Sequence, residues 1–252
     1  MNAPVVKPAD AVLSLTDLRF RYPGASHDTL DLSSITVAEH ERMLIKGDSG
    51  CGKSTLLSMA AGVMLANSGR VCLLGQDWAG LSAAKRDARR VDHVGYIFQQ
   101  FNLLPYLNVM ENVLMPCRFS ALRAQRAREE HGSAKQAASL LLDALELPQR
   151  SWTRSASELS VGQQQRVAAA RALIGHPEIL IADEPTSALD ENRRDVFMRL
   201  LIDQCERTGT ALVFVSHDMR LASYFNKVLD LPTLNRAAVA DTVGLVMQYK
   251  GT

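Results

Sequence analysis

A glycine-rich segment with one lysine and one serine is the clearest chemical pattern in the sequence. Residues 47–54 read GDSGCGKS and match the spacing GxxxxGK[ST]. Glycines let a backbone turn so that its N–H groups surround phosphate oxygens, and a following helix adds the positive end of its dipole. We expect Lys53 to reach the β- and γ-phosphates and Ser54 to bind Mg²⁺. The pattern predicts a nucleotide site but no particular reaction, since kinases and GTPases share it.

Two adjacent carboxylates end an apolar stretch further along the chain. Residues 178–184 read EILIADE, which is a buried-strand pattern followed by Asp183 and Glu184. We expect Asp183 to hold Mg²⁺ and Glu184 to polarise a water molecule for attack on the γ-phosphate. The alternative is a strand that ends in an ordinary polar turn.

The apolar patterns around these motifs predict strands that alternate with helices. This alternation favours an α/β fold with a largely parallel sheet. An Ala/Leu/Arg-rich region at about 107–147 has helical spacing and predicts a helical insertion. Residues 1–10 are expected to be loose, and the signal from 234 onward is weak. The expected strands are 12–15, 18–22, 43–45, 70–74, 94–98, 178–182 and 211–215, and the expected helices are 53–63 and 191–207.

Composition limits the classes of function. The chain has 252 residues, 28 of them basic and 27 acidic. This near-neutral balance argues against broad nucleic-acid binding, which needs a basic surface. No apolar run reaches the roughly 18–20 residues of a membrane span, and the first ten residues lack a signal-peptide pattern. We therefore expect a cytoplasmic protein with four reduced cysteines.

Further motifs resemble the ABC (ATP-binding cassette) family. Residues 159–166, LSVGQQQR, are similar to its LSGGQ signature, and they stand just before the acidic strand. Residues 185–190, PTSALD, resemble its D-loop, and 215–218, VSHD, resemble its switch-histidine segment. Gln99 resembles the Q-loop glutamine and Tyr22 the aromatic A-loop residue. The motifs follow the family order over about residues 12–230.

The resemblance implies a fold and a domain organisation. The fold class would be α/β, a P-loop NTPase of the ABC cassette type. It would have a mainly parallel RecA-like sheet, an N-terminal antiparallel β-subdomain and an inserted helical subdomain. Residues 1–252 would form a single nucleotide-binding domain, with the helical subdomain at about 100–165.

The resemblance also implies roles for particular residues, with ATP and Mg²⁺ as cofactors. Glu184, His217 and Gln99 would be catalytic, and Ser54, Gln99 and Asp183 would hold the metal ion. The residues expected to bind ATP are Tyr22, Gly47, Ser49, Gly50, Cys51, Gly52, Lys53, Ser54, Thr55, Ser160, Gly162 and Gln163. Three alternatives remain: Tyr22 as an ordinary strand aromatic, His217 as a strand-end histidine, and Gln100 in place of Gln99.

Two positions in these motifs have unusual side chains. Val161 occupies the place of the first signature glycine, and its β-branched side chain is expected to crowd the approach to a phosphate. Cys51 lies inside the phosphate loop near a helix N-terminus, where a thiolate is favoured. We therefore expect Cys51 to react with thiol reagents and ATP to protect it.

The family resemblance implies partners. Cassettes of this family work as head-to-tail pairs, so Ser160, Gly162 and Gln163 would contact ATP bound to a second copy of the chain. An integral membrane permease would be the other partner, and no nucleic acid is expected. The chain would then be cytoplasmic and peripheral on the inner face of the membrane.

The branch of the family is indicated by residues 98–105, FQQFNLLP, and 111–113, ENV. They resemble the ATPases of lipoprotein release and macrolide efflux. A small-solute importer, a soluble ABC protein and a non-hydrolysing regulatory switch are the alternatives. The substrate and the direction of transport are not encoded in these motifs.

Overall fold

The computed structural model describes residues 11–237, which divide into two compact units. Among these residues, the first unit contains 11–87 and 215–237, and the second contains Ala88–Phe214. The expectations for residues 1–10 and for the segment beyond 237 lie outside the described residues.

The first unit contains a four-stranded sheet in the order β2-β1-β4-β5. β1 pairs antiparallel with both β2 and β4, and β4 pairs antiparallel with β5. The two strands expected at 12–15 and 18–22 form the single strand β1. Its register against β4 shifts between Thr16 and Arg19, where Asp17 has a positive φ of 48°. The strands are β1 Leu13–Phe20, β2 Leu30–Val37, β4 Ser68–Leu73 and β5 Gln76–Asp77.

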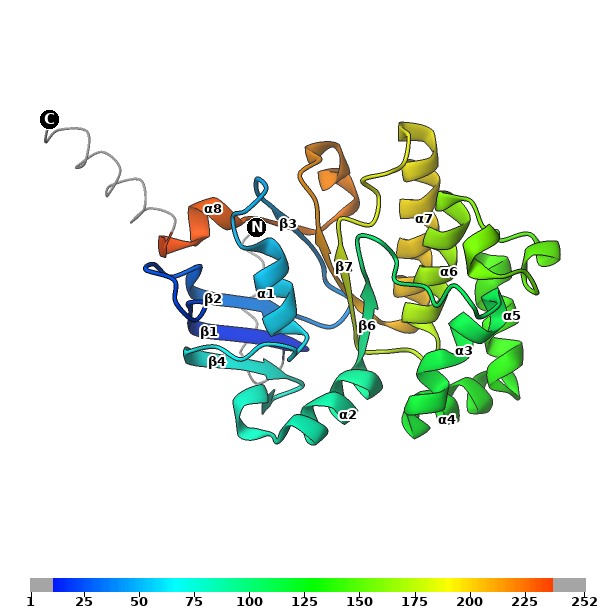
Figure 1. The fold of residues 1–252 in the computed structure, drawn as a ribbon, viewed down its shortest axis with the longest axis horizontal. Coiled ribbons are helices and arrows are strands. Elements are labelled where there is room, and N and C mark those ends of the chain that lie inside the picture. The colour runs from blue at the N-terminus through cyan, green and yellow to red at the C-terminus, as the bar shows by residue number, and fades with distance from the viewer. Residues whose placement is uncertain (1–10, 238–252) are drawn as a thin grey trace, which may run out of the picture. The chain divides into compact units, whose positions relative to one another are not determined.

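The same unit contains the strand and helix that flank the phosphate loop. β3 (Arg42–Lys46) has a buried centre and pairs parallel with β9 (Lys227–Asp230). α1 (Lys53–Ala60) contacts β4, as Figure 1 shows. α1 ends three residues earlier than expected, and Gly62 follows with a φ of 67°. The sequence patterns did not predict β2, β9, α2 (Ala83–His93), α8 (Leu231–Leu234) or the 3₁₀ turns Trp78–Gly80 and Met219–Tyr224.

The second unit contains the strand that leads to the acidic pair. β6 (Val94–Ile97) and β7 (Ile179–Asp183) pair in parallel, and β8 (Ala211–Val215) is the next strand in order. β8 and most of β7 are buried, which suits strands covered on both faces. α7 (Glu191–Thr208) begins with Asp190, whose carboxylate accepts the N–H of Arg193, and ends at Gly209. These strands confirm the mainly parallel sheet.

Four further helices of the second unit lie beside one another (Figure 1), and this confirms the helical insertion. Each of them begins at a serine or asparagine whose side chain accepts a backbone N–H, so the helix starts are set locally. Ala137, Leu141 and Leu145 are buried, as their spacing predicts. The helices are α3 Val109–Phe119, α4 Ala121–His131, α5 Ala134–Ala144 and α6 Val161–Leu173, and the short 3₁₀ turns Gln149–Ser151 and Ala156–Glu158 precede α6.

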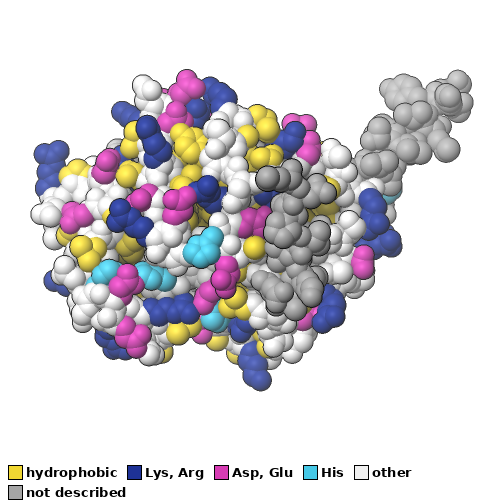
Figure 2. Space-filling view, turned by 180° about the vertical axis from the view of Figure 1, so that it is seen from behind, with side chains coloured by type: hydrophobic (Ala, Val, Ile, Leu, Met, Phe, Trp, Pro, Cys, Tyr) yellow, Lys and Arg dark blue, Asp and Glu magenta, His cyan; other side chains and the backbone are white. Residues whose placement is uncertain are grey.

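Within residues 11–237, no helix has both the length and the apolar character that crossing a membrane requires. Figure 2 shows basic and acidic side chains interspersed over the face in view.

Candidate nucleotide site

The phosphate loop connects β3 to α1 in the first unit. Gly52 precedes the helix with a φ of 100°, and an added Cβ there would lie 2.8 Å from Leu30 Cδ2. A Cβ on Gly47 would lie 2.5 Å from Cys51 Sγ. The positive φ of Gly52 favours glycine there, and a side chain at Gly47 would collide with Cys51 Sγ. The loop leads directly into the helix N-terminus, as the sequence predicts.

Lys53 is folded over the loop that it follows. Its Nζ donates to the carbonyl oxygens of Gly47 at 2.7 Å and Asp48 at 2.8 Å, and the residue is buried. The ammonium group is thus held at the loop, where a cation can meet phosphate oxygens. Ser54 is exposed in the first turn of α1, and Thr55 is buried behind it.

Tyr22 belongs to the same side of the first unit. Its hydroxyl oxygen lies 3.0 Å from Thr55 Oγ1, and its ring packs edge-on against Phe20 with centroids 4.8 Å apart. The ring is part-exposed and borders a hollow of about 480 Å³. A second hollow, of about 450 Å³, is lined by Gly50 and Cys51. The structure therefore joins the expected A-loop residue to the helix of the phosphate loop.

His217 is placed beside β3 by a backbone hydrogen bond. The N–H of Ser216 donates to the carbonyl oxygen of Ile45 at 3.2 Å. Ile45 precedes Gly47 by two residues. The phosphate loop follows the C-terminal end of β3, and His217 follows the C-terminal end of β8, the neighbouring strand in the sheet. His217 itself is exposed. The first unit therefore brings together Tyr22, the phosphate loop and His217.

The second unit brings Gln99 and the acidic pair to one edge. In the β6–β7 ladder, Ile97 is paired with Ala182. Gln99 and Glu184 each lie two residues beyond this pair. Glu184 has a positive φ of 45°, which is a strained backbone for a non-glycine residue and typical of functional sites. Burial, and then the charge of Asp183, raise the pKa of Tyr96, which places this carboxylate close to β6.

The signature residues begin α6. Ser160 is its N-cap, and its Oγ accepts the N–H of Gln163 at 3.4 Å, while the N–H of Ser160 donates to Gln163 Oε1 at 3.0 Å. This reciprocal capping box leaves other N–H groups of the first turn available to an anion. Ser160, Gly162 and Gln163 line a hollow of about 350 Å³. Val161 is 48% exposed at the first helical position.

Two residues that support the site had no role in the sequence interpretation. Gln165 is buried, and its Nε2 donates to the carbonyl oxygen of Pro185 at 3.0 Å, which ties α6 to the residue after Glu184. Arg171 donates to the carbonyl oxygens of Phe101 at 2.5 Å and Asn102 at 2.7 Å, two residues with positive φ. Gln165 lies within the signature segment 159–166, whereas a polar residue on the buried face of a helix was the only sequence signal for Arg171.

The expectation of a favoured thiolate at Cys51 is wrong. Burial raises the pKa of the Cys51 thiol, and this outweighs the opposing effect of the nearby Lys53 charge. The sulfur lies close against Gly47, and partial removal from water there disfavours the charged thiolate.

Comparisons with known proteins agree with this geometry. The family model described as ABC transporter matches residues 30–187. An uncharacterized ABC transporter ATP-binding protein, YbbA of Escherichia coli K12, is 37% identical over 89% of this chain and 96% of its own length. The lipoprotein-releasing system ATP-binding protein LolD of Hydrogenovibrio crunogenus is 36% identical over 88% of this chain and 94% of its own length.

A solved structure has the same fold. The cassette MJ0796, in a dimeric post-hydrolysis state bound to ADP and Pi, superposes with a TM-score of 0.76 at 33% identity. The match covers 87% of this chain and 94% of that one. The expected subgroup is confirmed by the likeness to LolD. The chain belongs to the ABC transporter family, in which it is an ATP-binding and ATP-hydrolysing cassette.

Proposed function

We propose that this chain is the ATPase subunit that powers a separate membrane permease of the lipoprotein-release or macrolide-efflux type. The observation that carries the proposal is the joint presence of a phosphate loop and a capped signature helix in a chain this similar to LolD. We further propose that residues 1–252 form one cassette, with a helical subdomain at about 100–165.

We propose for these residues the roles that the family resemblance implies, and the chemistry of the side chains supports them. We assign ATP binding to Tyr22, to the phosphate loop through Thr55, and to the signature. Ser54, Gln99 and Asp183 offer hard oxygen donors, which fit Mg²⁺. That ion would supply charge neutralisation at the phosphates. Glu184 would orient and deprotonate the attacking water, and His217 would contact the γ-phosphate.

A second copy of the chain is the first proposed partner. The capping box leaves the first turn of α6 pointing N–H groups at a surface hollow, which suits a phosphate brought by another molecule. MJ0796 is dimeric, and this supports the same arrangement here. The second proposed partner is a permease, with the chain peripheral on the inner face of the membrane. Exposed Phe98 and Tyr106, which follow β6, offer apolar surface for it.

The test of this proposal is Glu184→Gln, which removes the base without changing side-chain size. We expect ATP binding to persist and turnover to fall by about 10²–10⁴-fold. Size-exclusion chromatography should show a dimer only when MgATP is present. Glu39→Gln, at an exposed carboxylate in the first unit, is the matched control and should leave both readouts unchanged. Normal turnover in Glu184→Gln would remove the proposed catalytic role.

A further inference from the structure

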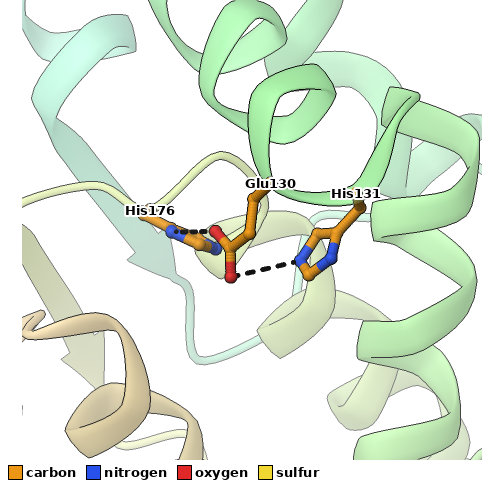
Figure 3. A group of neighbouring side chains, drawn as sticks. All are labelled: Glu130, His131 and His176. Carbon is orange, nitrogen blue, oxygen red and sulfur yellow. Dashed lines mark ion pairs between the residues drawn. The ribbon is translucent and has the colours of Figure 1, made fainter.

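A cluster of one carboxylate and two imidazoles lies in the second unit, outside the nucleotide motifs. Glu130 and His131 end α4, and His176 lies in the turn between α6 and β7. One carboxylate oxygen of Glu130 is 3.0 Å from His176 Nδ1, and the other is 3.4 Å from His131 Nε2. Figure 3 shows the carboxylate between the two rings. Among residues 11–237 this is the one group whose ligand atoms all lie within 4.8 Å of one another.

The backbone on the His176 side of the cluster is held by two arginines, Arg126, which is part-exposed, and Arg123, which is buried. Arg126 Nη1 donates to the carbonyl oxygen of His176 at 2.7 Å. Arg123 is fully enclosed and donates to the carbonyl oxygens of Ala172 and Ile174, at the end of α6. His176 has a positive φ of 50°, a conformation that costs energy unless surrounding contacts impose it. The backbone of His176 is therefore fixed by these contacts, and its ring is held by Glu130.

The donor set matches one class of ligand. Two imidazole nitrogens and one carboxylate oxygen are zinc ligands, and three protein ligands leave a fourth position for water. Zinc–ligand bonds of about 2.0–2.2 Å place tetrahedral ligand atoms roughly 3.3 Å apart. The two imidazole nitrogens approach different oxygens of the Glu130 carboxylate, at 3.0 and 3.4 Å, and one ligand atom from each residue lies within 4.8 Å of the others. Side-chain rotation would have to bring the three ligand atoms to this tetrahedral separation.

The electrostatic environment permits a cation. The nearest guanidinium, that of Arg126, opposes a metal ion, but its Nη2 is paired with Glu178 at 2.7 Å. Glu130 adds a negative charge inside the ligand set. The Glu130 side chain is half exposed, and both histidines are about one quarter exposed, so an ion has access from solvent.

We propose that Glu130, His131 and His176 form a zinc site that links the C-terminal end of α4 to the turn after the signature helix α6. The site is independent of ATP, because it uses none of the residues assigned to the nucleotide. Zinc bound there stabilises the folded chain, because the three donors come together only in that state.

The experiment uses the full, reduced chain without nucleotide or magnesium. Zinc is titrated against a chromogenic chelator, and the imidazole C–H resonances of the six histidines are followed by NMR. We expect one zinc ion per chain, shifts of the His131 and His176 resonances that saturate together, and a higher midpoint of thermal unfolding. His176→Asn and His131→Asn should weaken binding at least about tenfold, since even outer-shell partners cost 10–100-fold.

The controls separate this site from other zinc ligands. Asparagine tolerates a positive φ, so His176→Asn keeps the turn accessible. His40→Asn is the matched control, because His40 is exposed and also has a positive φ, 58°. Glu130→Gln tests the exposed carboxylate with little risk to folding. Equal zinc affinity in all variants, or His131 and His176 resonances that do not shift when zinc is added, would show an ordinary hydrogen-bonded cluster. Either result would overturn the proposal.

Discussion

The hydroxyl oxygen of Tyr22 lies 3.0 Å from Oγ1 of Thr55, in the first helix after the phosphate loop. This contact fixes the Tyr22 ring relative to α1 and leaves one part of the ring open to solvent. An exposed aromatic ring in that position is available to stack on a base. Tyr22 lies two residues beyond the end of β1, so it is not an ordinary residue of that strand.

Substitution of Tyr22 tests the stacking role. We expect Tyr22→Ala to weaken ATP binding by about 5–150-fold, because base–aromatic stacking contributes about 1–3 kcal/mol. Tyr22→Phe keeps the ring and loses only the contact with Thr55, so its affinity should stay near that of the wild type. A fluorescent ATP analogue measures both. Tyr106→Ala removes a more exposed tyrosine and serves as the control; equal affinity in Tyr22→Ala and the wild type would assign Tyr22 to packing.

Val161→Gly tests whether the valine hinders closure of the signature on a partner's ATP. Because the side chain is exposed at the start of α6, its removal opens space in front of the helix. We expect ATP-driven dimerisation or steady-state ATPase activity to rise by up to about tenfold, equivalent to about 1.4 kcal/mol of closure. The helix itself should lose at most about 1 kcal/mol.

Val63→Gly is the matched control for that experiment, since Val63 is exposed and lies outside every motif. It should change neither dimerisation nor ATPase activity. A lower activity in Val161→Gly, with unchanged thermal stability, would mean that the valine contributes to the partner contact.

Cys51 should react slowly with maleimide at neutral pH, because burial raises the pKa of its thiol and keeps it protonated. We expect the rate to increase with pH and MgATP to slow it further by covering the loop. Cys72 is similarly part-buried but belongs to β4, so its labelling should not depend on nucleotide. Mass spectrometry of the labelled peptides distinguishes the two. Labelling of Cys51 that is indifferent to saturating MgATP would contradict the proposed phosphate site.

Glu178 should make the stability of the fold sensitive to acid. Burial acts to raise its pKa, but hydrogen bonds and charges from His93 and Arg126 prevail and lower the pKa to about 2, from 4.5. A lowered carboxyl pKa stabilises the folded state above pH 4.5, and this contribution is lost progressively as the pH falls toward 2. We expect Glu178→Gln to be less stable than the wild type in urea at pH 7, with the difference shrinking through that window.

Glu129→Gln, an exposed carboxylate on α4, is the control for that measurement. Its urea midpoint should follow that of the wild type at every pH. If the difference in urea midpoint between Glu178→Gln and the wild type stayed constant from pH 7 to pH 2, the loss of stability would not be due to the titration of Glu178.

The sequence by itself determined the elements whose signals are local. The strand–loop–helix around Lys53, the apolar strand before Asp183 and the helix after Asp190 are set by residues within a few positions of one another. The family motifs extended this to the candidate roles of Tyr22 and Glu184. β9 was missed because its pattern is only four residues long, and β2 was missed because Ser33 and Ser34 interrupt its apolar alternation.

Only the tertiary structure decided the contacts between distant segments. The bond from Gln165 to Pro185 and those from Arg171 to Phe101 and Asn102 span 20 to 70 positions. The raised pKa of Cys51 and the ion pair between Glu130 and His176 also depend on the tertiary structure. Hydrogen bonding and burial depend on which atoms lie within a few ångströms of one another. Folding brings together residues that are far apart in the chain, and their spacing in the sequence does not indicate that they will be in contact.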